Sequence, residues 1–179
     1  MWCEKQAIDW AVGRRVDIIL MASGGTNDFD NVKKAINRLP DSVLFVAAAG
    51  NLPACTRVTF PARMGSKVMC IFAATASNKN SRALNPPPRN RGYNFAILGE
   101  AVQLEGNLGE PESGTSCAAA IAAAFAGILL HFSRQTLPEG ENDPLVLEDY
   151  LHERVNPIFE ELQETTKTTD MSVSRHPTS

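Results

Sequence analysis

The stretch VDIILMASGGTNDFDNVKKAINRLPDSVLFVAAAGN, residues 16–51, decides the fold class. It contains two nearly continuous apolar runs, 16–21 and 43–49, each followed by glycine, as expected for strands covered on both faces. Between them apolar residues recur at helical spacing, and Asp28 or Asp30 can cap the helix. Strand, helix and strand at this spacing are typical of a right-handed crossover in a parallel sheet. The sequence therefore predicts an α/β fold.

The flanking sequence extends this pattern. We expect a short helix at 3–12, two further strands at 68–75 and 95–98, and surface loops at 85–92 and 105–115. The alanine-rich run 117–130 is shorter than the ~20 residues that a membrane span needs, so it is predicted to be a buried helix. No membrane span is predicted.

The length of 179 residues allows one domain with a sizeable core, or part of a larger one. We expect residues 1–132 to form it. In the segment 133–164 an apolar stripe at 144–163 predicts an amphipathic helix, and the serine- and threonine-rich residues 165–179 are expected to be a disordered tail.

Composition and charge argue against several function classes. With 17 basic and 20 acidic side chains the formal net charge is −3, which gives no electrostatic reason to expect nucleic acid or an anionic membrane as a partner. The cysteines lack metal-ligand spacing, so the sequence indicates neither a zinc site nor a disulfide framework, and it assigns no metal and no cofactor. The lack of a signal-peptide pattern and of an N-glycosylation sequon favours an intracellular location.

Two places depart from what a core alone requires. In AAAGN (47–51) small side chains end a predicted strand, and a glycine turn presents Asn51 at the edge where open α/β sheets bind ligands. In SGTSC (113–117) a glycine loop places Ser116 at the amino end of a long helix, where partial positive charge and free N–H groups favour an oxyanion. Taken alone, an ordinary N-cap at Thr115 or Ser116 is the more frequent explanation.

The order of these segments resembles the subtilisin-like serine proteases, peptidase family S8. The resemblance covers residues 5 to about 132 and rests on AIDWAV, VDIILMASGG, VLFVAAAGN and SGTSCAAAIAAAFAGILL. It implies the carboxyl-terminal part of the catalytic domain, with a parallel sheet between helices on both faces and incomplete on its N-terminal side. The alanine-rich continuation is similar to that of fungal intracellular members.

The resemblance also implies residue roles. Ser116 would be the nucleophile, and the Asn51 amide with the Ser116 backbone N–H would form the oxyanion hole. Two segments would flank the substrate pocket: Ser23 and Gly24 on one side, and Ala48, Ala49 and Gly50 on the other. The sequence departs from the family at Ala22, where serine is usual, and after Ser116, where Met-Ala-[ST]-Pro-His is usual.

The other two members of the family's catalytic triad are missing from these residues. Neither D-[ST]-G nor H-G-[TS] occurs in the sequence, and a serine hydroxyl is a poor nucleophile without a positioned base. His131 lies 15 residues after Ser116 on the same predicted helix, which places it roughly 22 Å away. His152 and His176 lie in the predicted amphipathic helix and tail. We therefore expect the isolated chain to be inactive on its peptide or protein substrate unless a further segment supplies Asp and His.

Three alternatives remain at this stage. The chain could be a catalytically silent relative that binds peptides without chemistry. An α/β-hydrolase would use Ser116, Asp143 or Asp149, and His152, but its nucleophile elbow G-x-S-x-G is incomplete here. Nucleotide binding at Ser23-Gly24-Gly25 has the weakest support, because neither a P-loop nor G-x-G-x-x-G is present.

Overall fold

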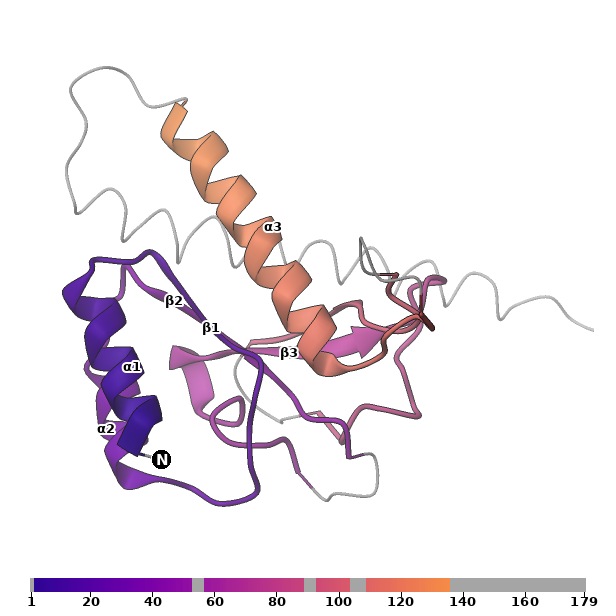
Figure 1. Cartoon of the computed structure of the whole chain (residues 1–179), viewed down its shortest axis with the longest axis horizontal. Coiled ribbons are helices and arrows are strands. Elements are labelled where there is room, and N and C mark those ends of the chain that lie inside the picture. The colour runs from indigo at the N-terminus through magenta and orange to yellow at the C-terminus, as the bar shows by residue number, and fades with distance from the viewer. Residues whose placement is uncertain (1, 53–56, 89–92, 104–108, 136–179) are drawn as a thin grey trace, which may run out of the picture.

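The computed structural model describes residues 2–52, 57–88, 93–103 and 109–135 (Figure 1). The elements in chain order are α1 (Trp2–Gly13), β1 (Ile18–Met21), α2 (Asp30–Asn37), β2 (Leu44–Ala48), the short 3₁₀ turn η1 (Gly65–Lys67), β3 (Met69–Ala74), β4 (Asn94–Leu98) and α3 (Thr115–Gln135). The four strands lie side by side in chain order and every neighbouring pair is parallel. The predicted α/β class is confirmed.

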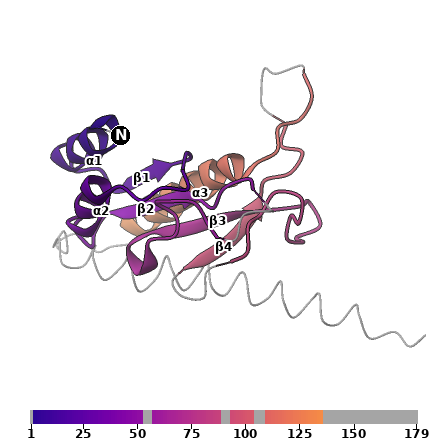
Figure 2. The same ribbon diagram turned by 90° about the horizontal axis from the view of Figure 1, so that it is seen from below.

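The sheet separates two layers of helices (Figure 2). On one face α1 and α2 cover a core that includes Phe45 and Ala47 of β2. On the other face α3 covers Val46 and Ala48 of the same strand. This division follows from the alternation of side chains along a strand, and it explains why β2 reads as a continuous apolar run.

Strand β1 differs from its prediction as a strand covered on both faces. It lies at one edge of the sheet and pairs only with β2 among the described strands. The Leu20 side chain is 42% exposed, and Trp10 on α1 is 64% exposed. The apolar run therefore predicted the strand correctly but not its burial. How far a strand is buried depends on which strands and helices lie beside it, and β1 has a strand on one side only among the described residues.

The predicted cap of α2 is wrong. The helix begins after Phe29, which provides no side-chain cap. The Asp28 carboxylate instead accepts hydrogen bonds from Lys33 and Arg63. The buried face of the helix is as predicted, with Val32, Ala35 and Ile36 in the core.

The prediction of a surface loop over 85–92 is wrong at its first two residues, Asn85 and Pro86, which are buried; residues 89–92 lie outside the described residues. Asn85 is buried and its amide binds the backbone of β3. Its Oδ1 accepts from the N–H of Ala73 at 2.8 Å, and its Nδ2 donates to the carbonyl of Ala73 at 2.6 Å. A side-chain amide offers the same donor and acceptor as a peptide group. Asn85 therefore satisfies the N–H and the carbonyl of Ala73 without belonging to a strand itself.

Helix α3 runs across the sheet and contacts all four strands. By length and composition alone, Thr115–Phe132 could cross a membrane. The core helices of globular proteins meet the same criterion, and the alanines of α3 allow close contact with the sheet: Ala118, Ala119, Ala122 and Ala126 are buried. One face of α3 therefore belongs to the core, whereas Ile128 and Phe132 are 65% and 64% exposed, so the prediction of a buried helix is correct for that face only. The predicted amphipathic helix at 144–163 and the predicted tail lie outside the described residues.

Candidate active site

The carboxyl ends of β1 and β2 lie at one edge of the sheet. Met21 is in register with Ala47, so the segments 22–25 and 48–51 leave the sheet side by side. The helix α3 begins at the same edge, because the side chain of Asn51 reaches its first residue. Residues far apart in the sequence thus meet where a parallel sheet offers a binding site.

Gly50 turns the chain from β2 toward α3. Its φ of +106° lies in a region that side chains rarely adopt, and a Cβ there would come within 2.6 Å of Thr59 Cγ2. Both the conformation and the space therefore require glycine. The turn directs Asn51 back over the start of the helix.

Asn51 binds the first residue of α3 through its side chain. Its Oδ1 accepts hydrogen bonds from the backbone N–H of Thr115 at 2.7 Å and from Thr115 Oγ1 at 2.9 Å. Thr115 is 1% exposed, and its Oγ1 also accepts from the N–H of Gly50 at 3.0 Å. Asn51, not a residue of the helix itself, therefore satisfies the N–H of Thr115.

These bonds fix which side of the Asn51 amide is left for a ligand. With Oδ1 committed to Thr115, Nδ2 is the remaining donor, and it lies 3.0 Å from the position that a Cβ on Gly114 would occupy. Among the described residues Nδ2 has no hydrogen-bond partner, and Asn51 is exposed. An amide donor is thus presented at the amino end of the helix.

Ser116 follows Thr115 in the first turn of α3 and is half-buried. The first four N–H groups of a helix have no partner inside the helix, so the Ser116 N–H is directed outward with the positive end of the helix dipole. The structure therefore places the Asn51 side chain against the first turn of α3, in which Ser116 lies. The arrangement can offer two N–H donors to one anionic oxygen beside a hydroxyl.

The five residues expected to flank the pocket differ in exposure. Ser23 and Gly24 are exposed and Gly50 is half-buried, whereas Ala48 and Ala49 are 3% and 0% exposed. The two alanine side chains belong to the core, so only the backbone of this segment can contact a ligand.

Thr59 is a residue that the sequence reasoning missed. It is buried, its N–H donates to the carbonyl of Ala49 at 2.9 Å, and its Oγ1 lies 3.3 Å and 3.1 Å from the carbonyl oxygens of Ala48 and Ala49. It thereby holds the segment before Gly50 in place. A single threonine ten residues away carries no local signal of this role.

The structure shows where the one histidine of the described residues lies relative to Ser116. This histidine, His131, lies on α3 and is exposed, and the helical rise places it roughly 22 Å from Ser116. Among the same residues no group of three or more His, Cys, Asp or Glu side chains could hold a metal ion.

The family is decided by a match of the subtilase family model, peptidase S8, to residues 3–151. The chain belongs to the subtilase family. The resemblance inferred from the sequence is thereby confirmed, and the α/β-hydrolase alternative is excluded. The likeness to fungal intracellular members stays a prediction.

Two kinds of relative support the subtilase assignment. The minor extracellular protease Epr of Bacillus subtilis (strain 168) is 31% identical over 100 residues, which are 55% of this chain and 14% of Epr. The prenylagaramide maturation protease PagA matches 73% of this chain and 50% of its own, with 26% identity and a TM-score of 0.62. The patellamide maturation protease PatA matches 75% and 52%, with 27% identity and a TM-score of 0.61. The chain spans about half the length of these two solved subtilases and a small part of Epr.

Proposed function

We propose that this chain carries the nucleophile and oxyanion hole of a subtilisin-like serine endopeptidase. Ser116 attacks the carbonyl carbon of a peptide bond, and the oxygen that becomes negative accepts from Asn51 Nδ2 and the Ser116 N–H. The observation that carries the proposal is the pair of hydrogen bonds from Thr115 to Asn51 Oδ1. They hold Nδ2 as the outward donor before substrate arrives, which is the preorganisation that oxyanion stabilisation needs.

The substrate is a peptide or protein. The exposed backbone of Ser23 and Gly24 and the backbone of Ala48, Ala49 and Gly50 flank the residue before the cleaved bond. Small residues suit these positions because a peptide must approach the backbone closely. The proposed chemistry uses no cofactor or metal ion.

The isolated chain is inactive in this proposal. The Ser116 proton needs a histidine base, and that base needs a carboxylate to orient it. Loss of the nucleophile or the base in another subtilase costs about 10⁶-fold in turnover. Activity therefore requires Asp and His from a longer chain or a separate polypeptide that completes the domain.

A second candidate function is a silent subtilase that binds peptides without cleaving them. It applies if no further segment supplies the motifs D-[ST]-G and H-G-[TS], neither of which occurs in the 179 residues. Both candidates bind peptide between the Ser23-Gly24 backbone and the backbone of residues 48–50, a proposed site that we call the peptide groove. They differ in whether a base reaches Ser116.

Labelling with a fluorophosphonate separates the two candidates. The coding sequence on the 5′ side of the Met1 codon is read for both motifs, and the 179-residue chain is compared with the extended polypeptide. The Ser116→Ala variant removes the nucleophile, and Ser113→Ala is a matched serine control in the preceding loop. Labelling of the extended form that is lost in Ser116→Ala supports the protease. No labelling of Ser116 in either form supports the silent module.

A further inference from the structure

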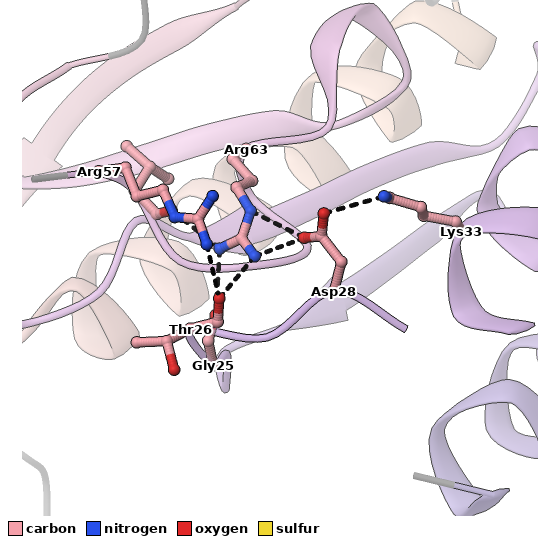
Figure 3. Close-up of polar contacts among 7 residues, drawn as sticks. Gly25, Thr26, Asp28, Lys33, Arg57 and Arg63 are labelled. Atoms are coloured by element: carbon pink, nitrogen blue, oxygen red, sulfur yellow. Dashed lines mark hydrogen bonds and ion pairs between the residues drawn. The ribbon is translucent and has the colours of Figure 1, made fainter. Parts of the chain in front are cut away.

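Arg63 binds the backbone that follows Ser23 and Gly24, and its whole guanidinium group takes part in hydrogen bonds (Figure 3). The side chain is 13% exposed. Its Nε donates to Asp28 Oδ1 at 2.9 Å, and its Nη2 also binds that carboxylate. The remaining bonds go to backbone carbonyls: Gly25 at 3.3 Å, Val58 at 3.2 Å and Thr26 at 2.8 Å. An arginine has five N–H donors, and this network accounts for all of them.

The three carbonyls belong to two segments that no strand of the sheet contains. Gly25 and Thr26 follow the exposed Ser23-Gly24 backbone, and Val58 precedes Thr59 and Phe60. The two segments meet through one pair of hydrogen bonds, from Gly25 N–H to Phe60 O at 2.9 Å and from Phe60 N–H to Gly25 O at 2.7 Å. A single pair is a weak connection, and Arg63 binds the backbone on both sides of it.

The contact between the segments is also close. A Cβ on Gly24 would come within 2.7 Å of both Phe60 O and Thr59 Oγ1. Thr59 in turn donates to the carbonyl of Ala49, immediately before Gly50. A shift of the 23–26 segment away from residues 58–60 would therefore change the distance between the two sides of the groove.

Asp28 fixes the other end of the arginine network. Its carboxylate also accepts from Lys33 of α2 at 2.9 Å, so the guanidinium is anchored to a helix of the core layer. The planar fork of arginine can bind a carboxylate and several carbonyls in fixed directions, which an ammonium group cannot do at once.

From these contacts we propose that Arg63 is a positioning residue that sets the width of the peptide groove. The inference rests on the groove of the proposed function and not on its chemistry. Arg63 does not contact Asn51, Thr115 or Ser116 in any described interaction. Its loss should therefore weaken peptide binding and leave the nucleophile unchanged.

The test measures binding without catalysis, in the full chain carrying Ser116→Ala. Fluorescein-labelled casein, an unfolded substrate of mixed sequence, is titrated and its anisotropy recorded. Adding Arg63→Ala should raise the dissociation constant of casein about tenfold. This is the effect of losing one or two well-placed hydrogen bonds between the peptide and the displaced 23–26 backbone. Arg57→Ala is the matched control, because Arg57 is exposed and donates to the same segment only once, to Thr26 O at 3.2 Å.

Two further measurements separate positioning from charge or overall stability. Arg63→Lys keeps the positive charge beside Asp28 but not the fork, so we expect it to bind casein as weakly as Arg63→Ala. Amide exchange at Gly25 and Phe60 should be about tenfold faster in Arg63→Ala, with β2 and β3 unchanged.

Several results would overturn the inference. These are no casein binding by the Ser116→Ala chain, equal affinity in Arg63→Ala and Arg57→Ala, full recovery by Arg63→Lys, or exchange that rises throughout the sheet. If Ser116 is never labelled but casein binding still depends on Arg63, the protease proposal fails and the positioning inference stands. If Ser116 is labelled but casein binding does not change in Arg63→Ala, the protease proposal stands and the positioning inference fails.

Discussion

Replacing Thr115 with valine tests the network that orients Asn51. Valine has nearly the same shape but no hydroxyl, so it removes the bond to Asn51 Oδ1 and the acceptor for the Gly50 N–H. Thr115 is 1% exposed, so water has little access to replace them. A lost bond together with a donor left unsatisfied costs about 2 kcal/mol in the free energy of unfolding. For a chain of this size that corresponds to a fall in Tm of roughly 4–8 °C.

The assay is urea unfolding followed by far-ultraviolet circular dichroism. Thr115→Ser is the control, because it keeps the hydroxyl and loses only a methyl group. We expect Thr115→Ser to retain most of the stability that Thr115→Val loses. Equal stability of Thr115→Val and the parent would refute the claim that the Thr115 hydroxyl joins the start of α3 to Gly50 and Asn51.

Other positions give sharp expectations. In urea unfolding, Gly50→Ala should destabilise the chain by about 2 kcal/mol or more, because of strain at positive φ and the contact with Thr59. Gly13→Ala is the control: a Cβ there meets nothing within 4 Å, so its free energy of unfolding should change little. The pKa of Asp28 is lowered by hydrogen bonds from Lys33 and Arg63, so its contribution is present above the ordinary aspartate pKa of about 3.9 and is lost as pH falls through the folded value. The parent should therefore exceed Asp28→Asn in stability at pH 6, and the difference should shrink as the pH falls below the ordinary aspartate pKa; a difference in urea titrations that stays constant from pH 6 into acid would contradict this. In an active extended polypeptide, Asn51→Ala should slow peptide hydrolysis by ~10²–10³-fold, as for the same donor in another subtilisin, and an unchanged kcat would exclude its role in the oxyanion hole.

The sequence predicted the strands and α3 well because their signals are local. Continuous apolar runs such as 43–49 are long enough to identify buried strands, and the alanines after Ser116 indicated close packing. The cap of α2 was wrong because Asp28 is used in a tertiary network with Arg63. Local cap preferences carry no information about such a distant partner.

The roles of the candidate site residues stay a prediction, and the residues that hold Asn51 in place were not predicted. Asn51 and Ser116 were expected to meet, and the structure places the Asn51 side chain on the residue before Ser116. Thr115 was interpreted only as a possible cap, because its bond to the Gly50 N–H joins residues 65 apart in the sequence. Asn85 was assigned to a surface loop for a similar reason: its proline-rich surroundings hid the bonds to Ala73.

The central claim is that one oxygen can bind both the Asn51 side chain and the start of α3. A crystal structure of the extended polypeptide after reaction with a fluorophosphonate tests it directly, since the phosphonyl oxygen takes the place of the oxyanion. We predict that this oxygen, on the group bound to Ser116, lies within about 3 Å of both Asn51 Nδ2 and the Ser116 backbone nitrogen. A phosphonyl oxygen turned away from Asn51, or attachment to a residue other than Ser116, would contradict the account.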